Sequence, residues 1–217
     1  MYKLVVFDLD GTLANTLEDL AVAVNCSLDS ECLPVHNNSC YNQFVGNGVN
    51  SLIKQAIGDK SDDINLVERV KAFFDSYYPQ HLCDHTSAYD GMSDLLCKLK
   101  KQSVKTAVHS NKPHVYVPHI LNKLYPQHEF ELAWGQQECY ERKPSAQALI
   151  AMMNKLNVSA DETLYVGDSD VDVFTAHNAG VKVCGVEWGF RGKNELMSAG
   201  ADFIAKDPYE LYEIIVG

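Results

Sequence analysis

The stretch LVVFDLDGT, Leu4 to Thr12, decides the fold, because an apolar run typical of a buried strand ends in two carboxylates. Side chains of a strand alternate between the faces of a sheet, so Asp8 and Asp10 point to the same side. Two acids held this close at the edge of a core repel each other and lose hydration unless a cation, a proton or hydrogen-bond donors compensate. We therefore expect the rest of the chain to supply a partner for this pair.

Strand and helix patterns alternate regularly in the second part of the chain. This alternation predicts an α/β fold with a doubly wound, Rossmann-like parallel sheet and helices on both faces. Pro113 and Pro144 fit first-turn positions of two of the helices. We expect strands at 105–110, 130–135, 163–168, 181–189 and 201–205, and helices at 93–101, 113–124, 145–156, 171–179, 194–198 and 208–215.

Helical patterns, and no strand, follow the paired acids. After Thr16, apolar residues recur at helical spacing up to Leu28, and further helical patterns cover about 52–57 and 66–77. The next convincing strand, KTAVHS at 105–110, lies far beyond the short connection of a simple strand–helix–strand unit. We expect an α/β core domain, residues 1–14 and 88–217, interrupted by a small helical domain, residues 15–87.

Polar side chains gather where the predicted strands end, which is the edge at which open parallel sheets bind ligands. Carboxylates clustered with open geometry suit Mg²⁺, a hard ion that keeps other positions for water or phosphate oxygens. The cation would offset the acidic cluster and attract a phosphate. The polar residues at these ends are Asp8, Asp10, Ser110, Asn111, Lys112, Asp168, Asp170 and Asp172, and Lys143 lies just before a helix.

These side chains are suited to phosphoryl transfer. Gly11 lets the backbone turn sharply near an anion, and Thr12 can add a donor. Ser110 and Lys143 would bind phosphoryl oxygens. One carboxylate can then attack the phosphorus and form an aspartyl-phosphate. The other can protonate the leaving oxygen and later deprotonate the attacking water.

Four segments, DLDGT, HSNK, RKP and GDSDVD, resemble in this order the motifs of haloacid dehalogenase-like phosphatases, and the helical insertion looks like their small cap domain. The match covers nearly the whole chain. Through VGNGV, SNK, GDSDVDVFTAHNAG and VEWGFR the chain is most similar to phosphoglycolate phosphatase-like hydrolases. The resemblance implies Asp8 as nucleophile, Asp10 as acid/base, Ser110 as phosphate-binding hydroxyl, Lys143 as stabilising lysine, and Mg²⁺ held by Asp8, the backbone carbonyl of Asp10, Asp168 and Asp172.

Some positions have two readings. Asn111 and Lys112 either support the site or belong to a helix start, and Asp170 is expected to cap a helix or face solvent. The loop Gly46–Asn47–Gly48 is either a cap loop that reaches the site and selects the substrate, as the family implies, or an ordinary interhelical turn. Where these phosphatases usually continue DGTLxD, this chain has Asn15, which leaves the four-motif chemistry intact and the substrate open.

Composition limits the partners. A formal charge of −11 argues against nucleic acid or an anionic membrane surface, and no apolar run reaches the roughly 20 residues that span a bilayer. Seven cysteines without CxxC spacing suggest reduced thiols in the cytoplasm. The expected partner is a small-molecule phosphomonoester, and the oligomeric state is not indicated.

Other functions share parts of this pattern. A sugar-phosphate mutase has the same acid pair and differs in cap contacts. A haloacid dehalogenase does not need Asp10 or the metal motif. A receiver domain, which is a phospho-accepting switch, is shorter and carries its acceptor on a later strand, and a degenerate binding module would not keep every catalytic residue. We therefore predict a cytoplasmic, Mg²⁺-dependent phosphatase that hydrolyses a small, phosphoglycolate-like phosphomonoester.

Overall fold

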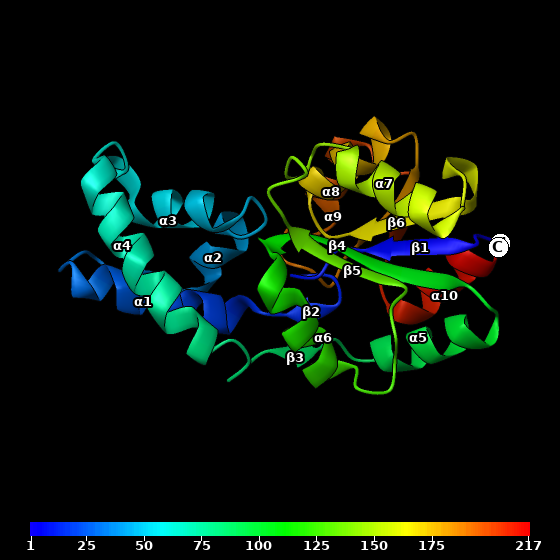
Figure 1. Cartoon of the computed structure of the whole chain (residues 1–217), viewed down its shortest axis with the longest axis horizontal. Coiled ribbons are helices and arrows are strands. Elements are labelled where there is room, and N and C mark those ends of the chain that lie inside the picture. Colours follow the sequence, from blue (N-terminus) through cyan, green and yellow to red (C-terminus); the bar gives the residue numbers. More distant parts are fainter. The chain divides into compact units, whose positions relative to one another are not determined.

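The structure is a computed structural model that describes residues Met1–Gly217. The chain divides into two compact units (Figure 1). We call Met1–Ala14 together with Ala88–Gly217 the core unit, and Asn15–Ser87 the inserted unit. None of the helices combines the length and the apolar character that crossing a membrane requires.

A six-stranded sheet forms the centre of the core unit, with the strand order β5-β4-β1-β6-β7-β8. All neighbouring strands run parallel. The chain adds strands on one side of β1 and then on the other, so β1 lies at the topological switch point of a Rossmann-like sheet. The predicted fold class is confirmed. The strands are β1 (Leu4–Phe7), β4 (Lys105–Pro113), β5 (Leu132–Gln136), β6 (Thr163–Gly167), β7 (Lys182–Val186) and β8 (Phe203–Ala205).

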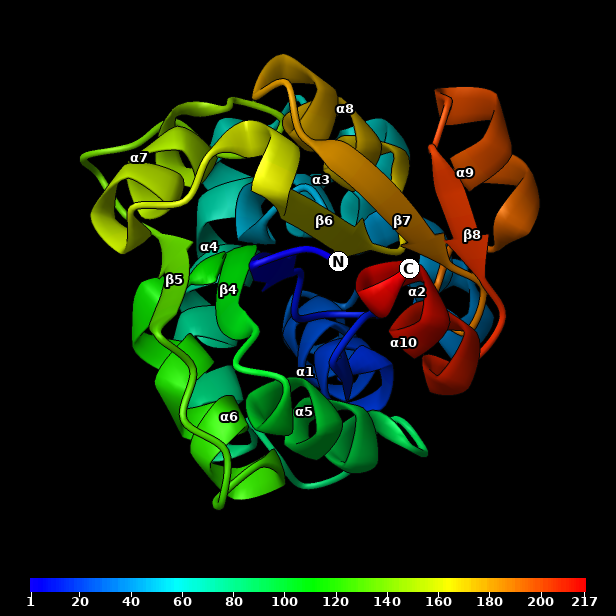
Figure 2. The ribbon, with the colours of Figure 1, turned by 90° about the vertical axis from the view of Figure 1, so that its right-hand side faces the viewer.

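Helices cover both faces of this sheet (Figures 1 and 2). One face carries α7 (Gln147–Leu156), α8 (Asp170–Asn178) and α9 (Lys193–Ala199), and the other carries α5 (Met92–Lys101), α6 (Val117–Leu124) and α10 (Pro208–Val216). Short 3₁₀ turns at His114–Tyr116 and Ala160–Glu162 precede α6 and β6. Because both faces are covered, the central strands can be apolar throughout.

β1 is buried along its whole length, and this makes it a firm support for the acids that follow it. Leu4 and Val6 pack in one apolar cluster with Leu149 and Met152 of α7 and Val173 of α8. Each fully buried apolar side chain of this size contributes about 1.5–3 kcal/mol to folding. The position of Asp8 is thus set by a fully buried strand at the centre of the sheet.

The inserted unit consists of helices. Its helices are α1 (Leu17–Ser30), α2 (Asn38–Phe44), α3 (Val49–Ile57) and α4 (Ile64–Tyr77), with 3₁₀ turns at Gly58–Lys60 and Tyr78–Gln80. Helix α2 was not expected, because its short and mostly polar sequence has no helical repeat. It is held by Tyr41, which is fully buried and whose hydroxyl donates a hydrogen bond to Asn25 Oδ1 at 2.7 Å.

The chain passes between the two units through a pair of short strands. β2 (Ala14–Asn15) and β3 (Ser87–Ala88) form a two-stranded sheet of their own. Within the inserted unit, the buried carboxylate of Asp19 joins the start of α1 to the segment before β3. It accepts hydrogen bonds from the backbone N–H groups of His85 (2.9 Å) and Thr86 (2.8 Å) and from the Thr86 hydroxyl (2.6 Å).

Two helix starts predicted from prolines were wrong. β4 continues to Pro113, α6 begins at Val117, and the proline in its first turn is Pro118. Pro144 lies before α7, which begins at Gln147, and a cis peptide bond joins it to Lys143. The first error arose because β4 still pairs with β5 at Pro113, after a register irregularity that follows His109. A local proline signal does not report such long-range pairing.

Candidate active site

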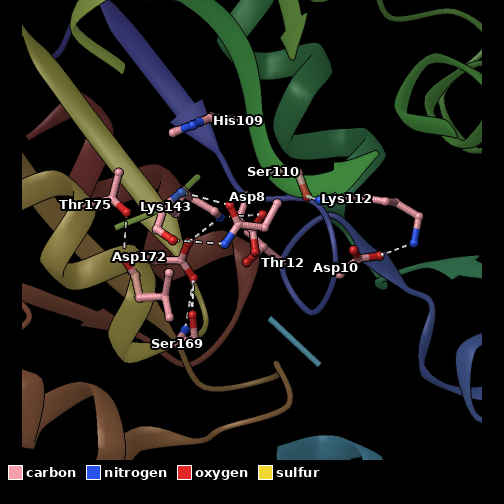
Figure 3. A network of polar contacts seen from close by, with 12 residues as sticks. Asp8, Asp10, Thr12, His109, Ser110, Lys112, Lys143, Ser169, Asp172 and Thr175 are labelled. Atoms are coloured by element: carbon pink, nitrogen blue, oxygen red, sulfur yellow. Dashed lines mark hydrogen bonds and ion pairs between the residues drawn. The ribbon is translucent and has the colours of Figure 1, made fainter. Parts of the chain in front are cut away.

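The predicted site residues of the core unit meet at the carboxyl ends of three neighbouring strands. Asp8 follows β1, Ser110 lies near the end of β4, and Asp168 follows β6. Figure 3 shows Asp8, Asp172 and Lys143 close together, with Asp10 and Lys112 on the other side of Thr12. The switch point of the sheet is therefore lined by acids and two lysines.

Lys143 lies between two buried carboxylates. Its Nζ is 2.8 Å from Asp8 Oδ1 and 2.7 Å from Asp172 Oδ1. All three residues are buried, with Asp8 only 5% exposed. Burial of one ammonium between two carboxylates leaves an excess of negative charge, which is unfavourable in a medium that solvates charge poorly.

Asp172 holds Lys143 with one oxygen and the start of α8 with the other. Its Oδ2 accepts hydrogen bonds from the Asp168 N–H (3.2 Å), the Ser169 N–H (3.1 Å) and the Ser169 hydroxyl (2.7 Å). These contacts belong to a capping box at the helix N-terminus, where a negative charge is also favoured by the helix dipole. Asp172 is thus bound to protein donors through both of its oxygens.

Asp168 is enclosed by two close backbone segments. Its Oδ2 accepts a hydrogen bond from the Phe190 N–H at 2.8 Å, and Oδ1 lies 3.4 Å from the Thr12 hydroxyl. A Cβ on Gly11 would lie 2.3 Å from Asp168 Oδ2, and a Cβ on Gly189 would lie 2.1 Å from the Asp168 Cβ. Only glycine fits at these two positions, so the backbone fixes the direction of this carboxylate.

The excess of negative charge appears in the pKa values of the acids. Burial raises the pKa of the Asp8 carboxyl to about 7, and the charges of Asp172 and Asp10 add to this rise against the opposing effect of Lys143. Burial and the charges of Asp172 and Asp8 raise the pKa of Asp168 well above its usual range. Burial lowers the pKa of Lys143, but Asp172 and Asp8 outweigh it and hold that pKa well above its usual value.

The cluster suits a hard divalent cation. Asp8, Asp168 and Asp172 offer carboxylate oxygens that all lie within 4.8 Å of one another. Asp8 Oδ1 is buried and accepts no well-aligned hydrogen bond, although the Lys143 ammonium is near it. Carboxylate oxygens, one of them without a hydrogen bond, and an uncompensated negative charge favour binding of a hard cation such as Mg²⁺. The residues present therefore fit the predicted metal.

Three consecutive residues near the end of β4 contact three different partners. The irregular register between His109 and Pro113 turns these side chains in different directions, as bulges do. Ser110 Oγ accepts a hydrogen bond from the Lys112 N–H at 3.2 Å. Asn111 Oδ1 accepts from the Lys143 N–H at 2.8 Å, and its Nδ2 donates to the Lys143 carbonyl at 3.2 Å. Asn111 thus positions the backbone of Lys143, and its phosphate contact stays a prediction.

The third residue, Lys112, makes an ion pair with the second acid of the opening motif. Its Nζ is 3.0 Å from Asp10 Oδ1, and the two side chains are 3% and 12% exposed. Sequence analysis did not predict this partner for Lys112, because a sequence pattern does not report contacts between residues so far apart in the chain. Asp10 lies outside the group of three carboxylates around Lys143.

Comparison with known proteins shows the family of the chain. The family model described as haloacid dehalogenase-like hydrolase matches residues 5–186. The chain belongs to the haloacid dehalogenase-like hydrolases. The resemblance stated from the four motifs is thereby confirmed.

Relatives within this family are similar over their whole length. The phosphoglycolate phosphatase of Mannheimia succiniciproducens is 32% identical and that of Chromobacterium violaceum 34% identical, with 99% and 98% of this chain and 98% and 96% of those proteins covered. The crystal structure of a predicted phosphoglycolate phosphatase from Haemophilus somnus matches with a TM-score of 0.90 at 31% identity, covering 98% of this chain and 97% of that one. The predicted enzyme class, a phosphatase, is confirmed.

The structure of this haloacid dehalogenase-like hydrolase assigns supporting contacts to the turn after β1. Gly11 has a φ of 86°, a left-handed conformation that favours glycine. Thr12 donates its hydroxyl toward Asp168 and accepts a hydrogen bond from Trp188 Nε1 at its carbonyl (3.1 Å). Thr12 is therefore tied to the acid cluster, and the role of the Glu187–Arg191 loop in holding Asp168 was not predicted. The sequence signal for this contact was the VEWGFR segment, which sequence analysis used only as part of the family resemblance.

The remaining predicted positions lie at the edge of the site or in the inserted unit. Asp170 is the first residue of α8, and its N–H donates to Glu195 at 3.4 Å. Gly46, Asn47 and Gly48 connect α2 to α3, and both glycines have positive φ. Asn15 belongs to β2, where its Oδ1 lies 3.5 Å from the Leu17 N–H, the distance of a weak contact at the start of α1.

Proposed function

We propose that this phosphatase is Mg²⁺-dependent and hydrolyses a small phosphomonoester, 2-phosphoglycolate in the first instance, through an aspartyl-phosphate on Asp8. The observation that carries the proposal is Asp8 Oδ1, which is buried, accepts no well-aligned hydrogen bond and lies beside the Lys143 ammonium. The full-length similarity to phosphoglycolate phosphatases supports the substrate class.

In the first half of the reaction, a carboxylate oxygen of Asp8 attacks the phosphorus. The bond between phosphorus and the ester oxygen breaks, and Asp10 gives its proton to the departing oxygen. Lys143 stabilises the negative charge that accumulates around the phosphoryl group. Ser110, at the neighbouring strand end, is the candidate donor to another phosphoryl oxygen.

In the second half, Asp10 takes a proton from a water molecule while that water attacks the phosphorus. The bond between Asp8 and phosphorus breaks, inorganic phosphate is released, and both acids return to their starting states. An acid and base positioned in this way typically contributes 10² to 10⁴ in rate. Asp10 thus donates a proton in the first half-reaction and accepts one in the second.

Asp8, Asp168, Asp172 and the backbone carbonyl of Asp10 would hold the cation, and Asp172 also contacts Lys143. When bound, Mg²⁺ supplies positive charge that binds the substrate phosphate and keeps the buried carboxyls ionised. Gly46, Asn47 and Gly48 of the inserted unit remain candidates for substrate selection. The seven cysteines, all of them free thiols, support a reducing compartment, which we take to be the cytoplasm.

Phosphate release from a panel of small phosphomonoesters tests the proposal. The panel contains 2-phosphoglycolate, its neutral analogues and hexose phosphates, each assayed with Mg²⁺ and with EDTA. We expect Mg²⁺-dependent release with a preference for one substrate. Isomerised sugar phosphate without free phosphate would identify a mutase, and no reaction on any ester would favour a phospho-accepting or binding module.

A further inference from the structure

Lys112 has a buried ammonium group to which the proposed phosphoryl-transfer reaction assigns no role. Its side chain is 3% exposed, and its Nζ pairs with Asp10 at 3.0 Å. Lys143 pairs with Asp8 and Asp172 instead. Figure 3 shows the two lysines reaching the two acids of the opening motif from opposite sides. Lys143 is therefore the ammonium beside Asp8, and Lys112 is a second ammonium beside Asp10.

A buried lysine is a costly way to stabilise a fold. Removing an ammonium from water costs several kcal/mol, and a well-packed apolar side chain at the same place would often be as stable or more so. Lys112 also follows Ser110 and Asn111 in the irregular part of β4, where the chain departs from regular pairing with β5. Such local departures commonly aim side chains at a functional site.

The position of Lys112 relative to Asp10 places it near the leaving group. As acid, Asp10 must come within about 2.6–3.2 Å of the departing oxygen. The Lys112 ammonium is 3.0 Å from the Asp10 carboxylate. The ammonium and the ester oxygen are thus both neighbours of one carboxyl group, and a group attached one carbon beyond that oxygen can reach the ammonium.

We infer that Lys112 is a specificity-determining residue that binds an anionic group, a carboxylate in the first instance, carried on the leaving group one carbon from the ester oxygen. This inference rests on the proposed function. While Asp10 serves the departing oxygen, the substrate carboxylate gives the buried ammonium a second acceptor, so that its charge stays paired. A charge-assisted hydrogen bond of this kind is about twice as strong as a neutral one.

Two esters that differ in one group test this inference: 2-phosphoglycolate and 2-hydroxyethyl phosphate, in which a neutral hydroxymethyl group replaces the carboxylate. The full chain and its Lys112→Met and Lys112→Arg variants are assayed for kcat and KM on both esters with Mg²⁺. Lys101→Met, at an exposed lysine of α5, is the matched control.

We expect Lys112→Met to lower kcat/KM for 2-phosphoglycolate at least about ten-fold more than for the neutral ester. Part of this difference should be a higher KM for 2-phosphoglycolate. Lys112→Arg should recover part of the preference because it keeps the charge, and Lys101→Met should leave the ratio between the esters at its original value.

Equal losses on both esters would overturn the inference, because Lys112 would then act only on Asp10 or on the fold. A native enzyme that shows no preference for the carboxylate ester would also overturn it, while the proposed function would stand. If Lys112→Met does not fold, competitive inhibition of the native enzyme by glycolate and by ethylene glycol decides, since only glycolate should inhibit. No phosphate release from either ester would instead overturn the proposed function.

Discussion

Asp8 carries the covalent step of the proposed reaction, so its replacement gives the sharpest test at the scale of one residue. Asp8→Asn keeps the size of the side chain but removes the nucleophile. We expect kcat to fall by about 10⁴-fold or more. Mass spectrometry of enzyme quenched during turnover should show one added phosphoryl group on the native chain and none on the variant. Asp170→Asn, which changes a carboxylate outside the cluster, is the control, and ordinary turnover by Asp8→Asn would rule out the mechanism.

Gly189 is predicted to control the metal through Asp168. An alanine there would place its Cβ 2.1 Å from the Asp168 Cβ, so the carboxylate would have to turn away. We expect Gly189→Ala to weaken Mg²⁺ binding by about ten-fold or more, as loss of a residue that orients a ligand does. Isothermal titration calorimetry measures this without substrate. Gly192→Ala is the control, because no atom lies within 4 Å of its Cβ position. Similar Mg²⁺ affinities in both variants would contradict the prediction.

His109 should make the protein less stable in acid. Burial lowers its pKa from 6.5 to about 3, and Lys143 adds to this. Between these two values the unfolded chain binds a proton that the native chain does not, so native stability falls as the pH falls. Between pH 7.5 and pH 5 this group should cost about 2 kcal/mol. Urea unfolding at several pH values should show a shallower acid loss for His109→Gln, and parallel curves for both proteins would disprove the assignment.

At the scale of secondary-structure elements, β4 shows what sequence patterns can and cannot predict. The apolar run before Ser110 identified the strand, because a buried parallel strand is apolar on both faces. The position of Ser110 at its end followed from the same pattern. The continuation to Pro113 was missed, since it depends on pairing with β5 across space. The partners of Asn111 and Lys112 were missed for the same reason, as each contact joins segments that only the folded sheet brings together.

The β4 end and the segment before α7 are joined by Asn111, which leads to a further prediction. Asn111→Ala removes two buried hydrogen bonds to the backbone of Lys143. We expect the free energy of unfolding to fall by about 2 kcal/mol and kcat to fall by about ten-fold, since Lys143 loses its alignment. Urea unfolding and steady-state kinetics measure the two effects.

Asn178→Ala is the matched control for Asn111. Asn178 donates one exposed hydrogen bond to the Pro144 carbonyl in the same segment, at 2.9 Å. Its loss should change stability by less than about 0.5 kcal/mol, as surface substitutions usually do. If Asn178→Ala and Asn111→Ala have equal effects on kcat, the segment as a whole matters and the contact with Lys143 does not.

At the scale of the whole molecule, the two units should differ in how they respond to a change at Asp19. Asp19→Ala leaves two backbone N–H groups and the Thr86 hydroxyl without their shared acceptor. We expect a loss of about 3 kcal/mol, since hydrogen bonds to a charged group contribute roughly 1.5–3 kcal/mol each and are not additive. Hydrogen exchange should become faster in residues 15–87, while amides of the core sheet keep their protection. Uniformly faster exchange in both units would show that they unfold as one.

The short pair of β2 and β3 also bears on how such a protein can change over generations. The inserted unit leaves the core unit and returns to it through two neighbouring strands, so the sheet of the core unit does not depend on what lies between them. The inserted unit can therefore acquire substitutions or insertions, or be exchanged as a whole. Such changes leave intact the strand order that positions the acids. The inserted unit can therefore vary in sequence while selection preserves the segments of the core unit that carry Asp8, Asp10 and Lys143.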